Sequence, residues 1–103
     1  MTDLDERVLH IVHEAIDRLN EERSDKPPLA KDPDTPLFGR DSTLDSLDLV
    51  NLIVAIEELV EERFDVLITL ANEKALSAKS SPFRTVATVS AYAGSLVREH
   101  TDG

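Results

Sequence analysis

Cysteine is absent from this chain of 103 residues, which excludes disulfide bonds, zinc–thiolate sites and a cysteine nucleophile. Aromatic residues make up only 4% and there are only three glycines, so an aromatic-rich β-sandwich is not expected. The longest uninterrupted apolar run, Leu52–Ile56, is far shorter than the about 20 residues that a membrane-spanning helix needs. The N-terminus is acidic and lacks the apolar core of a signal peptide, so we expect a cytoplasmic protein.

Negative charge dominates what is present. The chain has 11 Lys and Arg against 21 Asp and Glu, a formal net charge of −10. The excess is concentrated in residues 41–65, where Arg63 is the sole base, whereas residues 66–103 are close to neutral. Such a surface repels nucleic acids and anionic membranes and attracts basic proteins and divalent cations. We therefore expect neither nucleic acid nor membrane as a partner.

Apolar residues spaced by three and four predict an all-α fold. Residues 3–23 form the first expected helix, whose apolar positions are Leu4, Val8, Ile11, Val12, Ala15, Ile16 and Leu19. Residues 46–63 form the second, whose inward stripe is Leu49, Leu52, Ile53, Ile56, Leu59 and Val60. A short third helix is expected over residues 69–78 with Thr69 as its cap, and a last helix over residues 84–97. Gly94 costs that last helix roughly 1 kcal/mol relative to Ala, so it is expected to mark a close approach of two backbones.

Four prolines interrupt residues 24–44, where we expect a loop of about twenty residues. Its predicted anchors to the core are Leu29, Leu37, Phe38 and Leu44. The sequence thus predicts a single domain over residues 1–103, with its core between about residues 3 and 97 and a frayed tail from Arg98. The expected architecture is a four-helix bundle with a long first loop and a short third helix.

The sequence has no complete motif for catalysis or metal binding. His10 and His13 are three residues apart with Glu14 beside them, but a further metal ligand is not evident. The segment Asp32–Asp34 begins like a calcium loop, yet Leu37 and Thr43 occupy the positions where glycine and glutamate are required. There is no glycine-rich phosphate loop and no Gly-x-Ser-x-Gly motif. We expect neither an enzyme nor a metal site.

The informative segment is Leu44-Asp45-Ser46-Leu47-Asp48, where the long loop meets the second helix. Either Asp45 or Ser46 can be the N-cap of that helix. A second apolar set, rotated away from the inward stripe, consists of Leu47, Val50 and Val54. Carboxylates and an amide surround it: Asp48, Asn51, Glu57, Glu58, Glu61 and Glu62. Two interpretations remain open, namely a wide core stripe with a solvated charged rim, or a docking face with an apolar centre and an acidic border.

Several of these residues together resemble an acyl carrier protein. The resemblance is carried by Leu37-Phe38-Gly39, by Leu44–Val50 with the glutamate-rich helix that follows, and by Thr85-Val86. It implies a four-helix bundle in which Ser46 receives 4′-phosphopantetheine from coenzyme A, through a phosphopantetheinyl transferase and Mg²⁺. Asp45 matches the acid that the family usually has before its serine. The partner-contact positions correspond to Leu47, Asp48, Val50, Asn51, Val54, Glu57 and Glu58, although Asn51 replaces the usual carboxylate.

The absence of cysteine fits this resemblance, because the prosthetic arm would supply the thiol that holds acyl groups as thioesters. The chain departs from the family at Phe64-Asp65, which lies about one helical turn later than usual, and over residues 68–83, which form a longer stretch. These departures suggest a specialised carrier rather than the housekeeping one of fatty-acid synthesis. Acyl-activating, acyltransferase or synthase enzymes would be its further partners, and we expect a monomer. Two alternatives stay open, an aminoacyl or peptidyl carrier and an acidic helical interaction module without a prosthetic group.

Overall fold

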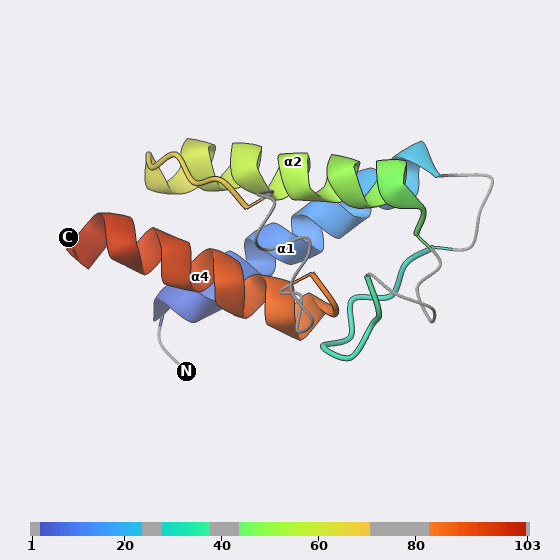
Figure 1. Cartoon of the computed structure of the whole chain (residues 1–103), viewed down its shortest axis with the longest axis horizontal. Coiled ribbons are helices and arrows are strands. Elements are labelled where there is room, and N and C mark those ends of the chain that lie inside the picture. Colours follow the sequence, from blue (N-terminus) through green and yellow to red (C-terminus); the bar gives the residue numbers. More distant parts are fainter. Residues whose placement is uncertain (1–2, 24–27, 38–43, 71–82, 103) are drawn as a thin grey trace.

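The computed structural model describes residues 3–23, 28–37, 44–70 and 83–102, and the regular secondary structure in these ranges is helical (Figure 1). Its helices there are α1 (Asp3–Glu22), α2 (Ser46–Phe64) and α4 (Val86–Asp102). Within these residues no strand is formed, and the only β-type pairing is an isolated bridge between Pro36 and Thr85. The all-α prediction is therefore confirmed.

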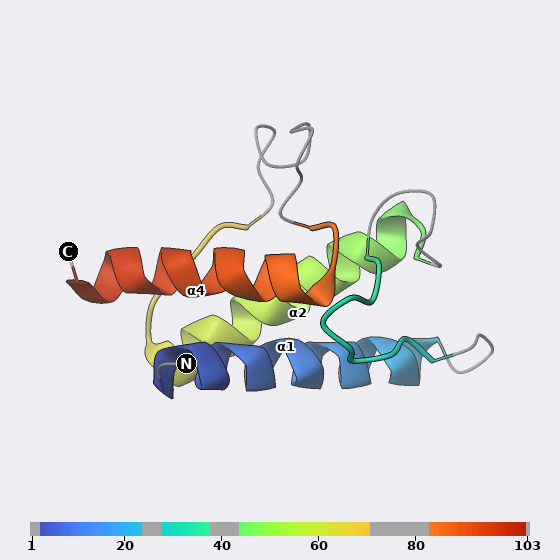
Figure 2. The same cartoon turned by 90° about the horizontal axis from the view of Figure 1, so that it is seen from below.

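Helix α1 forms the centre of the arrangement. Both α2 and α4 pack against it and run in the opposite direction along the chain (Figures 1 and 2). The predicted apolar face of α1 is the buried one, made of Val8, Ile11, Val12, Ala15, Ile16 and Leu19. Every member of the inward stripe predicted for α2 is also buried. The periodicity of each helix thus identified the face that packs.

Helix α2 ends at a residue with an unusual backbone conformation. Asp65 adopts the left-handed conformation, with φ 56° and ψ 36°, and its amide donates to the carbonyl oxygen of Glu61 at 3.0 Å. Aspartate is one of the few residues other than glycine that enters this region readily. The helix therefore ends at Phe64, and the chain turns back toward the core.

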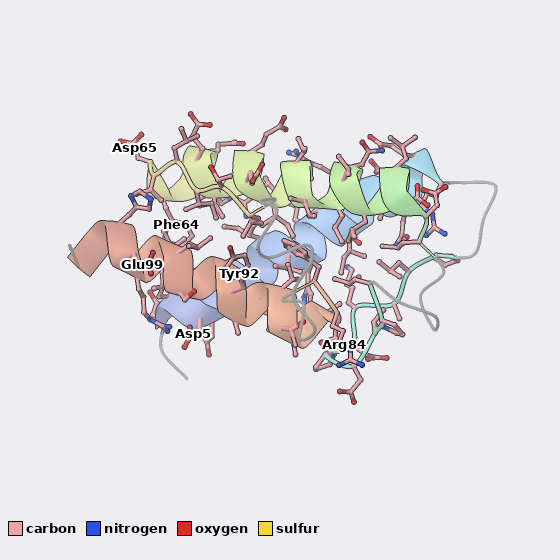
Figure 3. The ribbon with its side chains drawn as sticks, viewed as in Figure 1. Asp5, Phe64, Asp65, Arg84, Tyr92 and Glu99 are labelled. Atoms are coloured by element: carbon pink, nitrogen blue, oxygen red, sulfur yellow. The ribbon has the colours of Figure 1, made fainter. Side chains whose placement is uncertain are left out.

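Helix α4 is longer than the sequence indicated. We expected it to end at Val97 and the tail from Arg98 to fray, whereas it continues to Asp102. Arg98 forms an ion pair with Asp5 in the first turn of α1. Figure 3 shows Asp5 where the start of α1 meets α4. This pair links the last turns of α4 to the first turn of α1, and Val97 beside it is buried.

The segment of residues 28–37 is anchored at both ends (Figure 2). Near α1, the side chain of Asn20 accepts from the amide of Leu29 at 2.7 Å and donates to its carbonyl oxygen at 3.1 Å. Near α4, the carbonyl oxygen of Thr35 accepts from the amide of Val86 at 3.2 Å. Leu29 and Leu37 are buried as predicted, whereas Phe38 lies outside the described residues.

The predicted third helix lies mostly outside the described residues. Thr69 and Leu70, with which it was expected to begin, are not helical. Both Ile68 and Leu70 are buried, so the chain after α2 returns to the core before residue 71. The backbone amide of Leu70 donates to the carboxylate of Glu57 at 2.7 Å. A glutamate of α2 therefore fixes this returning segment.

Candidate functional site

The start of α2 is organised by Asp45. Asp45 is the N-cap, with an extended backbone, and its Oδ1 accepts from the amide of Asp48 at 2.8 Å. Its carbonyl oxygen accepts the first helical hydrogen bond, from the amide of Leu49 at 3.0 Å. Ser46 is the first helical residue, and its side chain lies outside the described part of the structure. Of the two possible caps, the aspartate is the one used, so the helix does not depend on the serine as its cap.

The position of Ser46 suits an anionic group. The first turn of a helix carries amide groups without partners inside the helix and the positive end of the helix dipole. A phosphate attached there is stabilised by both. Asp48 is the acidic residue within this turn, and its amide is already bonded to Asp45.

Asp48 does not lie on the surface where the resemblance places it. It is buried, and its Oδ2 lies 3.3 Å from Nε of Arg23, which is buried as well. Arg23 follows the last residue of α1, so the pair joins the end of α1 to the start of α2. Asp48 therefore supports the site from inside the protein. Arg23 was missed by sequence reasoning because no pattern links it to α2.

The second apolar set of α2 is exposed. The exposed fractions are 68% for Leu47, 51% for Val50 and 42% for Val54. Asn51 and Glu58 are also exposed on the same helix. We call these five residues the outer face of α2. Their exposure excludes the interpretation in which Leu47, Val50 and Val54 widen the core stripe, and leaves an apolar surface next to Ser46.

Glu57 has a different role from Glu58. Its side chain is half-buried and accepts from the amide of Leu70, so it is engaged inside the molecule. Three residues before Leu70, Leu67 is 68% exposed. Sequence reasoning did not select Leu67, because it lies between the expected helices of residues 46–63 and 69–78. Glu57 thus connects α2 to the segment that carries this further exposed leucine.

The two histidines of α1 do not converge on a third ligand. His10 is exposed and His13 half-buried, while Glu14 is bonded through Oε2 to Nη2 of Arg63 at 2.5 Å. This hydrogen bond lowers the pKa of Glu14 and raises that of Arg63. Across the described ranges, no three His, Cys, Asp or Glu side chains are grouped in a way that could hold a metal ion.

A cleft lies between α1, α4 and the segment of residues 28–37. Its volume is about 430 Å³, and it is walled mainly by apolar side chains such as Leu9, Pro33 and Ala91. The ion pair of Asp5 and Arg98 forms its polar end. Nothing in the sequence pattern of either helix alone indicated this cleft, because it arises where two helices and the 28–37 segment meet.

No protein-family model, curated protein or solved structure matches this chain, so the comparisons with known proteins do not identify a family. Among the helices of the described residues, none combines the length and the apolar character needed to cross a bilayer.

Proposed function

We propose that this chain is an acyl carrier protein, which holds acyl groups as thioesters on a 4′-phosphopantetheine arm attached to Ser46. One observation carries the proposal. Ser46 is the first residue of α2, the capping role belongs to Asp45, and the exposed Leu47 and Val50 follow directly. A modifiable serine thus stands at a helix N-terminus beside a surface on which enzymes can dock.

The attachment reaction needs no catalytic group from this chain. The Ser46 hydroxyl oxygen forms a new bond to the phosphorus that bears pantetheine in coenzyme A. The bond from that phosphorus to the bridging oxygen breaks, and adenosine 3′,5′-bisphosphate leaves. The hydroxyl proton passes to a base of the phosphopantetheinyl transferase, which also binds Mg²⁺. The product is a phosphodiester, whose charge the start of α2 stabilises.

The outer face of α2 is the proposed docking surface for the transferase and for acyl-activating, acyltransferase or synthase enzymes. Apolar contact with Leu47, Val50 and Val54 supplies binding energy on burial. Glu58 and the net charge of −10 favour partners with basic surfaces and accelerate their association. Asp48 is buried and Glu57 is engaged with Leu70, so their contribution to docking is indirect.

The proposal extends to the rest of the chain. It includes the short third helix expected from the sequence, which would complete a four-helix bundle, and a monomer acting in the cytoplasm. The length of the segment between Ile68 and Phe83 supports a carrier specialised for one pathway.

The decisive experiment is the intact mass of the protein after incubation with coenzyme A, Mg²⁺ and a broad-specificity phosphopantetheinyl transferase. We expect a gain equal to one phosphopantetheine group, and none for Ser46→Ala. Modification that persists in Ser46→Ala would place the site on another residue. An unchanged mass, under conditions that modify a known carrier, would contradict the proposal.

The exposed apolar surface also supports a second candidate, an acidic interaction module without a prosthetic group. Leu47 at 68% exposure would serve such a module equally well. The same mass measurement separates the two, because only a carrier gains the arm. For a modified protein, loading assays with acyl-activating and aminoacyl-activating enzymes then distinguish an acyl carrier from an aminoacyl or peptidyl carrier.

A further inference from the structure

A narrow cleft separates α1 from α2 beside the outer face. Its volume is about 200 Å³. It is smaller than the about 300–1,000 Å³ of pockets that enclose whole small molecules. The space therefore matches a single long side chain.

The floor of this cleft is apolar. On α1 it is formed by Ala15 and Leu19, both buried, and on α2 by Ala55, which is half-buried. Val54 forms one edge and remains 42% exposed. The alanines at facing positions leave room that larger side chains would fill. Ala15 and Leu19 are already shielded from water, so the apolar area that an aliphatic stem can cover belongs to Val54 and Ala55.

The rim of the cleft is polar and carries an excess of negative charge. Glu22 on α1 and Glu58 on α2 are both exposed carboxylates, and Asn51 adds an uncharged amide. Arg18 is the one base among the lining residues. An anionic guest would meet two carboxylates and the charge of the whole chain, whereas a cation finds a complementary rim.

The cleft is continuous with the surface already proposed for docking, since Asn51, Val54 and Glu58 belong to both. We infer that the α1–α2 cleft is a subsite for one arginine or lysine side chain that projects from the protein docked on the outer face of α2. The aliphatic stem lies against Val54 and Ala55, and the cationic end meets Glu22 and Glu58. This inference rests on the proposed docking function, and it adds α1 to the recognition surface.

The test uses a fluorescent helical peptide of about 18 residues, long enough to hold a helix in water. Its leucines recur at spacings of three and four, and one arginine stands at each end of that stripe, so that either orientation brings an arginine to the cleft. A matched peptide has citrulline, the neutral isostere, at both positions. Fluorescence anisotropy measures the affinity of each peptide for the full chain.

Two double variants provide the matched comparison. Glu22→Gln with Glu58→Gln removes the rim carboxylates, whereas Glu21→Gln with Glu99→Gln removes the same charge from exposed positions on α1 and α4, outside both the cleft and the docking surface. We expect the arginine peptide to bind about fivefold more weakly to the first variant, and within about twofold of the original protein to the second. The citrulline peptide should bind both variants equally. Equal losses of the arginine peptide in the two variants would overturn the inference, as would the absence of binding by either peptide.

A change at Arg18 tests the inference in the opposite direction, because it should strengthen peptide binding. Arg18→Gln removes the base that competes with the guest, so the arginine peptide should bind about twofold to fivefold more tightly. Arg84→Gln, at an exposed position outside the cleft, changes the net charge equally and serves as the control. The same gain in both variants would show that only net charge matters. These affinities do not depend on Ser46, so a failed subsite is distinguishable from a failed carrier proposal, which the mass measurement decides.

Discussion

Nε of Arg23 and Oδ2 of Asp48 lie 3.3 Å apart, and both side chains are almost completely buried, with 4% and 11% of their areas exposed. Asp48 is two residues after Ser46 in the first turn of α2, and the amide of Arg23 donates a hydrogen bond to the carbonyl oxygen of Leu19 in the last turn of α1. The pair therefore fixes the start of α2 relative to α1. The contact is an ion pair without a well-aligned hydrogen bond from Nε.

Breaking this pair should be costly. Asp48→Ala leaves the buried guanidinium of Arg23 without its carboxylate, and we expect the free energy of unfolding to fall by about 3–5 kcal/mol. Urea denaturation followed by circular dichroism measures this loss. Replacement of both residues, with Arg23→Met and Asp48→Leu, removes the two charges together and should recover most of the stability. A loss below about 1 kcal/mol in Asp48→Ala would show that the pair is not buried as described.

The cap of α2 separates the roles of two adjacent residues. Asp45→Ala removes the carboxylate that accepts from the amide of Asp48, which should cost about 0.5–2 kcal/mol. Ser46→Ala removes no cap, and alanine is a strong helix former, so its stability should stay within about 0.5 kcal/mol of the original protein. Thermal and urea denaturation of both variants, compared side by side, check this order. A larger loss in Ser46→Ala than in Asp45→Ala would contradict it.

Helical periodicity identified which side of α1 and α2 is buried, because residues three and four apart share a face. The same rule also applies to Asp48, which is four residues before Leu52 and eight before Ile56 and so lies on the inward face. Its charge led us to place it on the surface. The position on the helix decided the burial, and a buried partner, Arg23, made the charge acceptable.

Contacts between distant segments were beyond sequence reasoning. The ion pair between Arg98, in the extended part of α4, and Asp5 is a property of how two helices pack and not of either helix alone. The α1–α2 cleft likewise needs Ala15 and Ala55 to line the same space. Neither alanine could be selected from the sequence pattern of its own helix. By contrast, Leu29 and Leu37 could be predicted as anchors because apolar residues in a polar loop gain free energy by reaching the core.

The ion pair between Glu14 and Arg63 should make part of the stability depend on pH. The hydrogen bond from Arg63 holds the pKa of Glu14 below its usual value, so the folded state favours the ionised carboxylate. Its contribution is present above the pKa of an unfolded glutamate, about 4.3, and is lost as the pH falls through the lower pKa of the folded protein. We expect Glu14→Gln to lower Tm at pH 7, and the difference in Tm from the original protein to vanish in acid.

A matched control for this effect is Glu21→Gln, an exposed glutamate on the same helix. Its difference in Tm from the original protein should be smaller than that of Glu14→Gln at neutral pH. Both Glu14 and Arg63 are about 40% exposed, so salt should weaken the bridge as well. A Tm difference for Glu14→Gln that stays constant between neutral pH and pH 3 would contradict the role assigned to the bridge.

Gly94 has more room around it than the sequence suggested. We expected a close approach of two backbones, but in the described part of the structure a Cβ at this position would meet only Oδ1 of Asp5, at 3.6 Å, which is ordinary van der Waals contact. Glycine in a helix interior costs roughly 0.5–1 kcal/mol relative to alanine. Gly94→Ala should therefore raise the free energy of unfolding by about that amount, as measured by urea denaturation.

The reverse change on the same helix, Ala91→Gly at an exposed position, should lower the free energy of unfolding by a similar amount. Destabilisation by Gly94→Ala would mean that α1 and α4 approach each other more closely here than the Cβ-to-Oδ1 distance of 3.6 Å implies, and that the glycine is required by packing.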